Sequence, residues 1–500
     1  MDYLDPRKRR YYNVRLIVGY VLVAIVIGLA TVIVVYGANG YGFNTKTGQI
    51  VENGLLFVDS KPGGAEIFLN GVDKQTATSA RMILPAGNYT LTLKKPGYRD
   101  WTRTFALNGQ SVGRYVYPFL FPVNPKFTNL RTYKTAPGII TESPSRHWLL
   151  VENNSLSGQS PVFNQYDTTT LDKTQPAVTR VSLPANLLTK YSAASKLTVV
   201  EWSTDNNNVL LKHTYPGGSE FIVFDRAKPS ESFNVNTTFS VSPDAVSLYN
   251  KSVSQLYIYD KTSGTLRLAN VSDQTLGQPI IKGALAYKSY AKNLVIYVTA
   301  NNEPAGRVAA KIWDNGKVYT LFEFKAGRYY LIDLAQYQGD FYYFAGSDAE
   351  GRVNIFKNPL NDLTDTATGK AIAFLSLSLP GAAAGSFSDN AQFIGLENGQ
   401  HFAVYDLQTG DAYNYSVKDP LAANMEWMDG DRYIGESSGA ILVMDYDGSN
   451  PQRLGSTNLP VGGYFSGNYN HLLTLVPDSK NSGVILQDVD MRAGTDLPKQ

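Results

Sequence analysis

The chain has 500 residues, and its 45 lysines and arginines nearly balance its 43 aspartates and glutamates, which leaves a formal net charge of +2. This balance excludes the strongly basic surface that is typical of nucleic-acid-binding proteins, so we expect no nucleic-acid partner. Cysteine is absent, which excludes disulfides, thiolate catalysis and cysteine-ligated metals, and the abundance of Tyr, Phe and Gly favours strands.

The first predicted element is a membrane-spanning helix that begins at Leu16 and ends at Tyr36. This run contains no charged residue, and at ~1.5 Å of rise per residue it covers the ~30 Å hydrocarbon core of a bilayer. The alternative is a cleaved signal peptide, whose apolar core would be only ~7–15 residues long. Tyr36 also disrupts the small-residue pattern that a cleavage site before Ala38 would need. We therefore predict a retained anchor with the lipid bilayer as its partner.

The charges beside this helix predict its orientation. The segment before it, residues 1–15, contains a basic cluster that consists of Arg7, Lys8, Arg9, Arg10 and Arg15, whereas the segment up to Gln49 on the other side contains only Lys46. Positively charged flanks remain in the cytoplasm. We therefore predict a single-pass protein of the cell membrane with a cytoplasmic N-terminus and an extracytoplasmic C-terminal bulk.

After a polar linker over residues 37–53, residues 54–123 form a small all-β module with short alternating strands. The Asn70-Gly71 pair is a hairpin signal, because both residues accept positive φ. The run from Val58 to Gly71 includes Pro62, Gly64, Ala65, Asn70 and Gly71, and together with Leu84, Gly87, Tyr89 and Gly97-Tyr98 it resembles the PEGA domain. The resemblance implies a β-fold of prokaryotic envelope proteins, a scaffold module without established chemistry. Two positions depart from the family pattern: Gly63 replaces a Glu, and Ser79 replaces a Pro.

A weak repeat runs through residues 127–497 and predicts the remaining architecture. Its marker is an aromatic or apolar residue, a polar turn with Asp or Asn, and then an apolar strand. The markers lie ~40 residues apart where they are clear, as expected for four-stranded propeller blades. They occur at Trp202–Asp205, Val241–Asp244, Phe387–Asn390, Trp427–Gly430 and Phe465–Asn468. The fold class that we predict is therefore all-β: a transmembrane helix, a PEGA-like domain and a propeller of seven or eight blades, with eight favoured.

A second signal within each unit is a strand that ends in Asp, followed by a polar turn. The stretch that contains Asp445 is the clearest, and it is similar to the WD40-like repeat of the periplasmic propeller in the Tol system. The final unit, from Tyr464 to Arg492, supplies only part of a blade. Because an unclosed ring leaves free sheet edges, we predict that the residues around Leu130–Lys134, or the first strand after them, complete this blade.

Candidate chemical motifs are weak. Gly435–Gly439 matches G-x-S-x-G, but a strand follows it, so we interpret it as a hairpin tip rather than a nucleophile elbow. Asp445-x-Asp447-Gly448 starts like a calcium loop but lacks the final Glu, and we interpret it as a blade turn. The four histidines are widely separated. We therefore predict no catalytic residue, no cofactor and no metal.

Two functions follow from this organisation. The first is a non-enzymatic, membrane-anchored scaffold or binding protein of the cell envelope, whose propeller presents a surface to a protein or glycan partner. The alternative is a propeller enzyme that acts on envelope glycans with carboxylates in its channel, since paired carboxylates cleave glycosidic bonds. The candidate carboxylates are Asp205, Asp244, Asp389 and Glu426.

Overall fold

The structure is a computed structural model that describes residues 6–38, 40–43, 50–153, 160–173, 176–189, 191–192, 194–364 and 369–497. It divides into two compact units. The first unit contains Met1–Asn124 together with Ala493–Leu497, and the second contains Pro125–Arg492. Each unit is described separately below.

The first unit begins with helix α1 (Pro6–Ala38), which contains both predicted limits, Leu16 and Tyr36. Its stretch Arg10–Gly37 is long and apolar enough to cross a membrane, and none of its most apolar window is buried in the protein. A helix that is apolar on all sides and unburied suits a lipid environment. The apolar N-terminal helix is therefore confirmed, while its retention and its orientation remain predictions.

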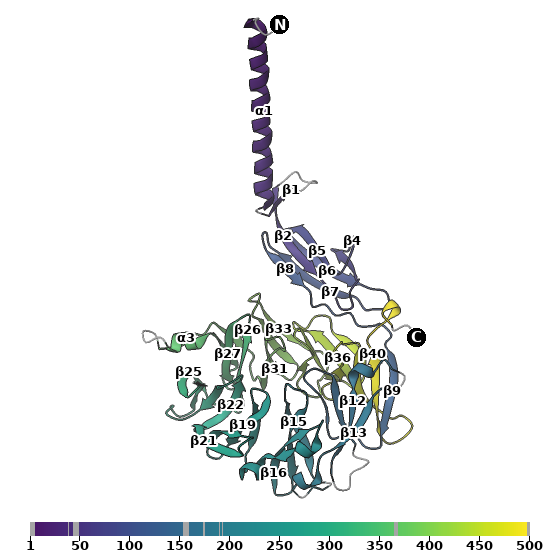
Figure 1. Cartoon of the computed structure of the whole chain (residues 1–500), viewed down its shortest axis with the longest axis vertical. Helices are drawn as coiled ribbons and strands as arrows, with labels where there is room; N and C mark the ends of the chain where they lie inside the picture. Colours follow the sequence, from purple (N-terminus) through teal and green to yellow (C-terminus); the bar gives the residue numbers. More distant parts are fainter. Residues whose placement is uncertain are drawn as a thin grey trace. The chain divides into compact units, whose positions relative to one another are not determined.

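A small β-domain follows α1 (Figure 1). One of its four-stranded sheets contains β1 (Tyr41–Phe43), β2 (Ile50–Val58), β5 (Ala80–Pro85) and β8 (Val112–Tyr115), and the other contains β3 (Glu66–Leu69), β4 (Val72–Ala77), β6 (Gly87–Lys94) and β7 (Trp101–Leu107). Buried residues of both sheets, including Leu56, Ile67 and Leu91, form the core. Asn70 and Gly71 form the β3–β4 turn with φ values of 50° and 77°, as the Asn-Gly signal predicts.

The last described residues of the chain, which contain the 3-10 turn η6 (Gly494–Asp496), pack against this β-domain. The hydroxyl of buried Tyr98 accepts a hydrogen bond from the backbone N–H of Ala493 at 2.8 Å and donates one to Asp496 at 2.9 Å. Lys95 forms an ion pair with Asp496 at 3.2 Å. The predicted propeller range, which ended at residue 497, included this segment, but its contacts are with the first unit.

The second unit consists, in its described residues, of eight four-stranded antiparallel sheets. The first four are β10 (Ile140–Glu142), β11 (Trp148–Glu152), β12 (Val162–Asp167), β13 (Val178–Ser182); β14 (Lys196–Trp202), β15 (Asn208–Tyr215), β16 (Gly218–Asp225), β17 (Phe233–Asn234); β18 (Ala245–Tyr249), β19 (Ser252–Asp260), β20 (Thr265–Asn270), β21 (Thr275–Ile281); and β22 (Ala284–Tyr290), β23 (Leu294–Thr299), β24 (Arg307–Asp314), β25 (Lys317–Lys325).

The next three sheets are β26 (Tyr330–Tyr337), β27 (Asp340–Ser347), β28 (Arg352–Lys357), β29 (Leu375–Ser378); β30 (Ala384–Phe387), β31 (Phe393–Asn398), β32 (His401–Asp406), β33 (Ala412–Ser416); and β34 (Glu426–Trp427), β35 (Arg432–Ser437), β36 (Ala440–Asp445), β37 (Gln452–Ser456). Two short helices, α2 (Val235–Phe239) and α3 (Pro359–Thr364), and the 3-10 turns η3 (Thr168–Thr170), η4 (Ala185–Leu187) and η5 (Pro229–Glu231) lie in connecting segments.

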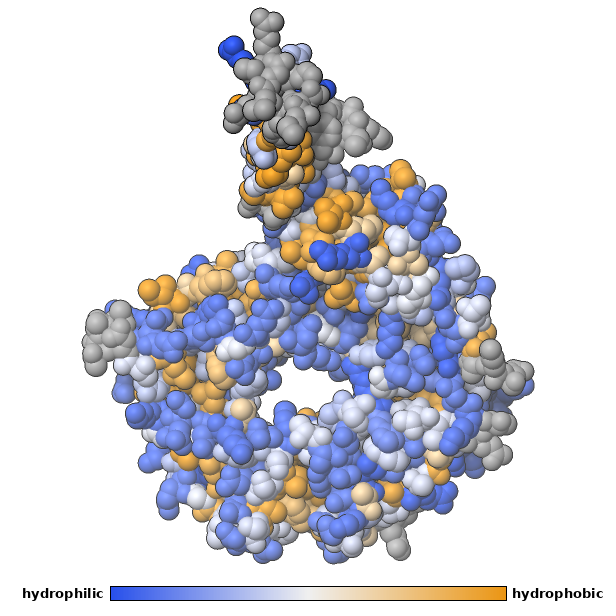
Figure 2. Space-filling view, turned by 45° about the horizontal axis from the view of Figure 1, so that its top comes forward, coloured by the Kyte–Doolittle hydropathy of each residue, from blue (hydrophilic) through white to orange (hydrophobic). Residues whose placement is uncertain are grey.

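The eighth sheet joins the two ends of this unit. It contains β38 (Tyr464–Phe465), β39 (His471–Pro477) and β40 (Val484–Asp490), and β9 (Lys126–Tyr133) completes it by pairing antiparallel with β40 from Val484↔Tyr133 to Asp490↔Lys126. The predicted closing strand around Leu130–Lys134 is thus confirmed. The sheets surround a central channel, which is visible as an opening in Figure 2. The second unit is a β-propeller.

The burial of the strands explains the sequence pattern. Every residue of β23, a second strand of its sheet, is buried, whereas the outer strand β33 alternates between exposed and half-buried residues. Strands that are buried on both faces have continuous apolar sequences. In strands with one solvent-exposed face, apolar and polar residues alternate along the sequence. Aromatic rings join neighbouring sheets, as between Phe393 and Tyr446, whose ring centroids lie 4.0 Å apart.

Candidate functional site

Four of the five repeat markers, all except Val241–Asp244, lie at the turn between the first and second strands of a sheet. In four sheets a serine directly follows the first strand, and its Oγ accepts a hydrogen bond at 3.1 Å from the backbone N–H five residues later. The serines are Ser143, Ser203, Ser388 and Ser466. These hydrogen bonds satisfy backbone groups that the turn would otherwise leave unpaired. The marker is therefore a stabilising feature of the propeller.

The Asp or Asn two residues after the serine belongs to the same turn. Asp205 accepts hydrogen bonds from Ser203 and from the Asn207 backbone N–H, and Asn390 and Asn468 make the equivalent pairs of bonds. Asx side chains commonly close turns in this way. Asp205 thus has a structural role in the turn.

The other predicted markers lie in different environments. Trp202 and Trp427 donate their indole N–H groups to Thr141 and Ser386 of the preceding sheets. Asp244 directly precedes β18, at the end of this strand away from the β18–β19 turn. It accepts a hydrogen bond from the Lys261 backbone N–H at 2.7 Å. Asp445 ends β36, where it is buried and bonded to Asn450 at 2.9 Å. None of these four contacts involves Asp205.

Asp389 differs, because it lies between the serine and the Asx residue of its turn. Its carboxylate is 56% exposed and contacts Arg146 Nη2 at 3.4 Å. Arg146 comes from the first sheet and Asp389 from the sixth, so the contact joins sheets that are not adjacent in the chain. We call the group Glu142, Arg146, Asp389 and Glu426 the channel cluster.

Arg146 is the centre of the channel cluster. It occupies a left-handed turn position with φ of 58°. Its Nε lies 3.6 Å from Glu142, its Nη2 donates to the Met428 carbonyl of the seventh sheet, and its guanidinium lies 4.8 Å from the Tyr469 ring of the eighth. Its Nη1 is buried and has no hydrogen-bond partner among the described residues. One side chain thereby links four sheets around the channel.

The channel cluster contains more acidic than basic groups, and the pKa values reflect this. Burial raises the pKa of Glu142 to about 8, because the attraction of Arg146 is too weak to compensate and Glu426 and Asp389 add repulsion. Burial and the charge of Asp389 raise the pKa of Glu426. Partial desolvation also raises the pKa of Asp389, although 56% of its side chain is exposed and Arg146 opposes the shift. A protonated carboxyl beside ionised ones can donate a proton or bind a polar or cationic group.

The G-x-S-x-G stretch is a hairpin tip, as predicted. Its Ser437 ends β35 and is buried, and Ser438 and Gly439 form the turn to β36 with φ values of 53° and 76°. A nucleophile elbow would need an exposed serine between a strand and a helix. Ser437 lacks both features.

The histidines lie far apart in the second unit. His213 is buried and contacts Glu220 at 2.7 Å, and His147 contacts Asp167 at 3.0 Å. His471 contacts Asp488 at 3.0 Å and Asp172 at 3.2 Å, and Arg492 bridges Asp172 and Asp490. We call His471, Asp488, Asp172, Arg492 and Asp490 the closure cluster, because it joins the eighth sheet to the first. Within the described ranges, no group of three or more His, Asp or Glu residues is placed to hold a metal ion.

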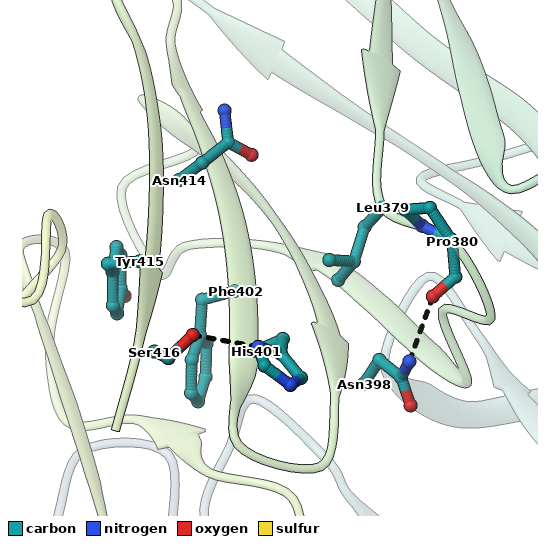
Figure 3. A pocket seen from close by; sticks show the side chains of 8 residues that line it. All are labelled: Leu379, Pro380, Asn398, His401, Phe402, Asn414, Tyr415 and Ser416. Atoms are coloured by element: carbon teal, nitrogen blue, oxygen red, sulfur yellow. Dashed lines mark hydrogen bonds between the residues drawn. The ribbon is translucent and has the colours of Figure 1, made fainter. Parts of the chain in front are cut away.

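The fourth histidine, His401, lines a cavity of about 500 Å³ beside the sixth sheet (Figure 3). Its Nδ1 lies 2.7 Å from Ser416 Oγ, its directly opposite partner on β33, and Asn398 donates to the Pro380 carbonyl at 2.8 Å. A catalytic serine–histidine pair needs a third group that orients the imidazole. No carboxylate contacts His401 in the part of the chain that the structure describes. The pair is therefore a cross-strand hydrogen bond on an exposed surface.

Sequence reasoning identified Asp389 and Glu426 but missed Glu142, Arg146 and Tyr469. The marker was aligned on its Asp or Asn, and the first sheet has Ser145 at that position. The signal that would have found Arg146 is the serine itself: Arg146 and Tyr469 each follow their turn serine by three residues, and both have φ near 60°.

The comparisons with known proteins cover the two units unequally. Residues 53–116 match the PEGA domain. No curated protein matches the sequence. Among solved structures, the chain is similar to Hsv2p of Kluyveromyces lactis, with 10% identity, a TM-score of 0.37 and coverage of 71% of this chain and 97% of that one. It is also similar to a dihydro-heme d1 dehydrogenase, NirN, in complex with DHE, with 12% identity, a TM-score of 0.39 and coverage of 67% and 69%.

A third similar structure is an oligogalacturonate lyase in complex with manganese, with 9% identity, a TM-score of 0.37 and coverage of 74% of this chain and 98% of that one. Scores and identities this low transfer no activity from these proteins. The propeller assignment depends instead on the radial sheets and the β9–β40 closure. The chain therefore contains a PEGA domain, preceded by an apolar helix and followed by a β-propeller.

Proposed function

We propose that this protein is a non-enzymatic, membrane-anchored binding or scaffold protein of the cell envelope, and that its propeller binds a protein or glycan partner outside the cytoplasm. The apolar, unburied α1 and the basic residues at its start support anchorage with a cytoplasmic N-terminus. The PEGA domain supports an envelope location.

The observation that carries the binding role is the channel cluster. Its members come from three sheets, and its three carboxyl groups outnumber the single arginine. The carboxylate of Asp205, by contrast, accepts a hydrogen bond from the Asn207 backbone N–H within its own turn. Partners that offer hydroxyl, amide or amino groups match an acidic site that also contains an arginine with the Tyr469 ring beside it.

Site-specific photo-crosslinking in intact cells tests this proposal. A photoreactive phenylalanine at Ser145, an exposed residue beside Arg146, should form adducts with an envelope component. The same group at Val318, which is 51% exposed on the outer strand β25, is the matched control and should form none. Absence of adducts from position 145, or equal adducts from both positions, would contradict the proposal.

A second candidate function is cleavage of envelope glycans. The raised pKa of Glu142 beside Glu426 and Asp389 favours it, because glycosidases pair a protonated carboxyl with an ionised one. Release of soluble sugar from isolated envelopes is the test. Release that is lost in Glu426→Gln and Asp389→Asn variants with unchanged folding would favour the enzyme, and no release from wild-type protein would reject it.

A further inference from the structure

The β-domain has an outer sheet face that combines apolar and basic side chains. Leu56 of β2 is buried in the core, so its neighbours Leu55 and Phe57 lie on the opposite, outer face of the sheet. Residues that are paired across strands share a face. The pairs Leu55↔Ile83 and Leu55↔Val112 therefore form an apolar row across β5, β2 and β8 (Figure 1).

A basic row lies beside the apolar row. Phe57 is paired with Arg81 on β5 and with Arg114 on β8, and the Arg114 guanidinium lies 5.3 Å from the centroid of the Phe57 ring. Both arginines are exposed, and neither forms an ion pair with another described residue. The acidic residue that follows β2, Asp59, is half-buried and accepts a hydrogen bond from the Ser60 N–H at 2.8 Å. The two exposed guanidinium groups are therefore free to bind anions.

The two outer faces of the β-domain differ in polarity. On the first sheet, Ile83 is 64% exposed and Val112 is 53% exposed. On the second sheet, Thr90 of β6 is paired with Thr104 of β7, and their hydroxyls are 3.1 Å apart. Apolar residues that gather on one exposed face mark an interaction surface. We call Leu55, Phe57, Arg81, Ile83, Val112 and Arg114 the basic apolar face.

The chain connects the basic apolar face closely to helix α1. The helix ends at Ala38 and β1 begins at Tyr41, whose ring centroid lies 5.4 Å from that of Tyr36. Strand β1 pairs with β2 through Tyr41↔Glu52, three residues before Leu55. At ~3.5 Å per residue, these two short segments together span at most ~20 Å. A bilayer that contains α1 is therefore within reach of this face.

We propose that the basic apolar face docks on the bilayer around α1, with Ile83 and Val112 between the lipid head groups and Arg81 and Arg114 on their phosphates. This inference rests on the proposed anchorage by α1 and concerns a different surface from the channel cluster. Interfacial binding combines buried apolar area with the attraction of basic residues to anionic lipids. The short connection to α1 raises the effective concentration of lipid at this face, so that individually weak contacts suffice.

Electron paramagnetic resonance of the spin-labelled full chain in nanodiscs tests this proposal. The protein has no cysteine, so an introduced cysteine gives one label per chain. In phosphatidylcholine with one-third phosphatidylglycerol, a label at Val112→Cys should be at least ~3-fold less accessible to a water-soluble nickel complex than one at Thr104→Cys. Thr104 is the matched control, because it is exposed on the outer face of the second sheet.

A charge-reversal variant tests the role of the anionic lipid. Because Arg81 and Arg114 are exposed, Arg81→Glu together with Arg114→Glu should preserve the fold and make the Val112 label as accessible as the Thr104 label. Nanodiscs of phosphatidylcholine alone should also increase the accessibility of the Val112 label. A Val112 label that stays protected in the charge-reversal variant would overturn the proposal.

A third label, at Ile27→Cys in α1, reports the anchor separately. Protection of the Ile27 label together with full accessibility of the Val112 label would overturn the docking and leave the anchorage intact. Accessible labels at both positions would overturn the docking and the anchorage together.

Discussion

The closure cluster and the channel cluster are both polar, but their charges are arranged differently. In the closure cluster each carboxylate contacts a base: Asp488 contacts His471, and Asp172 and Asp490 contact Arg492. In the channel cluster Arg146 contacts Glu142 and Asp389, whereas Glu426 has no basic partner among the described residues. The comparison separates a group in which every carboxylate contacts a base, which joins sheets, from a group in which one carboxylate has no basic partner, which remains able to bind.

The pKa shifts follow this distinction at His471 and Asp172, although burial raises the pKa of Asp488 despite its hydrogen bond with His471. Burial disfavours the imidazolium of His471, but its hydrogen bond to Asp488 and the charge of Asp172 outweigh burial and raise the pKa of His471. The hydrogen bond from Arg492 lowers the pKa of Asp172. In the channel cluster, burial dominates and raises the pKa of all three carboxyls.

The largest expected effect is on the closure cluster. His471→Ala should lower the free energy of unfolding by about 3 kcal/mol, because it leaves buried Asp488 without its partner. Chemical unfolding of the full chain measures the change. His401→Ala, at an exposed histidine, is the control and should change it by less than about 0.5 kcal/mol. Equal effects of the two variants would mean that the buried ion pair of His471 contributes no more to stability than an exposed histidine does.

A pH-dependent effect is expected at the channel cluster. Since the pKa of Glu142 in the folded protein is raised from 4.5 to about 8, the folded state favours the protonated carboxyl, and stability falls as the pH rises through this interval. Glu142→Gln removes the penalty. It should leave stability unchanged at pH 4.5 and increase it by about 2 kcal/mol at pH 9.

Thermal unfolding at these two pH values measures this effect. Glu66→Gln, at an exposed residue of β3, serves as the control with no expected change at either pH. A Glu142→Gln variant that is less stable than wild type at pH 9 would mean that Glu142 stabilises the fold as an ionised partner of Arg146.

The smallest expected effect separates turn residues from channel residues within one turn. Ser388→Ala should cost about 1 kcal/mol, because its hydroxyl accepts from the Phe393 N–H and donates to Asn390. Asp389→Ala, at the next residue, should change stability by less than about 0.5 kcal/mol. Urea unfolding compares the two variants, and a reversed order would assign the structural role to Asp389.

The sequence predicted the architecture because its signals are local and repeated. The turns with Asp or Asn recur about every 40 residues, so their spacing predicted four-stranded units. The incomplete final unit predicted that residues around Leu130–Lys134, or the next strand, close the ring, and β9 does so. The packing of Ala493–Leu497 on the β-domain was not predictable, because it depends on contacts with Tyr98 and Lys95, which are about 400 residues away in the chain.

The candidate site was predicted only in part. Asp389 and Glu426 were selected as carboxylates near blade starts, and the structure places Asp389 against Arg146 and Glu426 within electrostatic range of Asp389 and Glu142. Asp205 and Asp244 shared that pattern, but their hydrogen bonds are to turn N–H groups. A pattern of residue types does not indicate which carboxylates are hydrogen-bonded to the backbone of a turn. The contact between Arg146 and Asp389 joins the first and sixth sheets, so it forms only when the ring of sheets closes.

Crosslinking from position 145 in cells that carry a Glu426→Lys, Asp389→Lys double variant tests most directly whether the channel cluster binds the partner. The account predicts adducts from the otherwise wild-type protein and a loss of at least tenfold in the double variant, with equal amounts of folded protein in the membrane. Adducts of undiminished intensity in the double variant would contradict it.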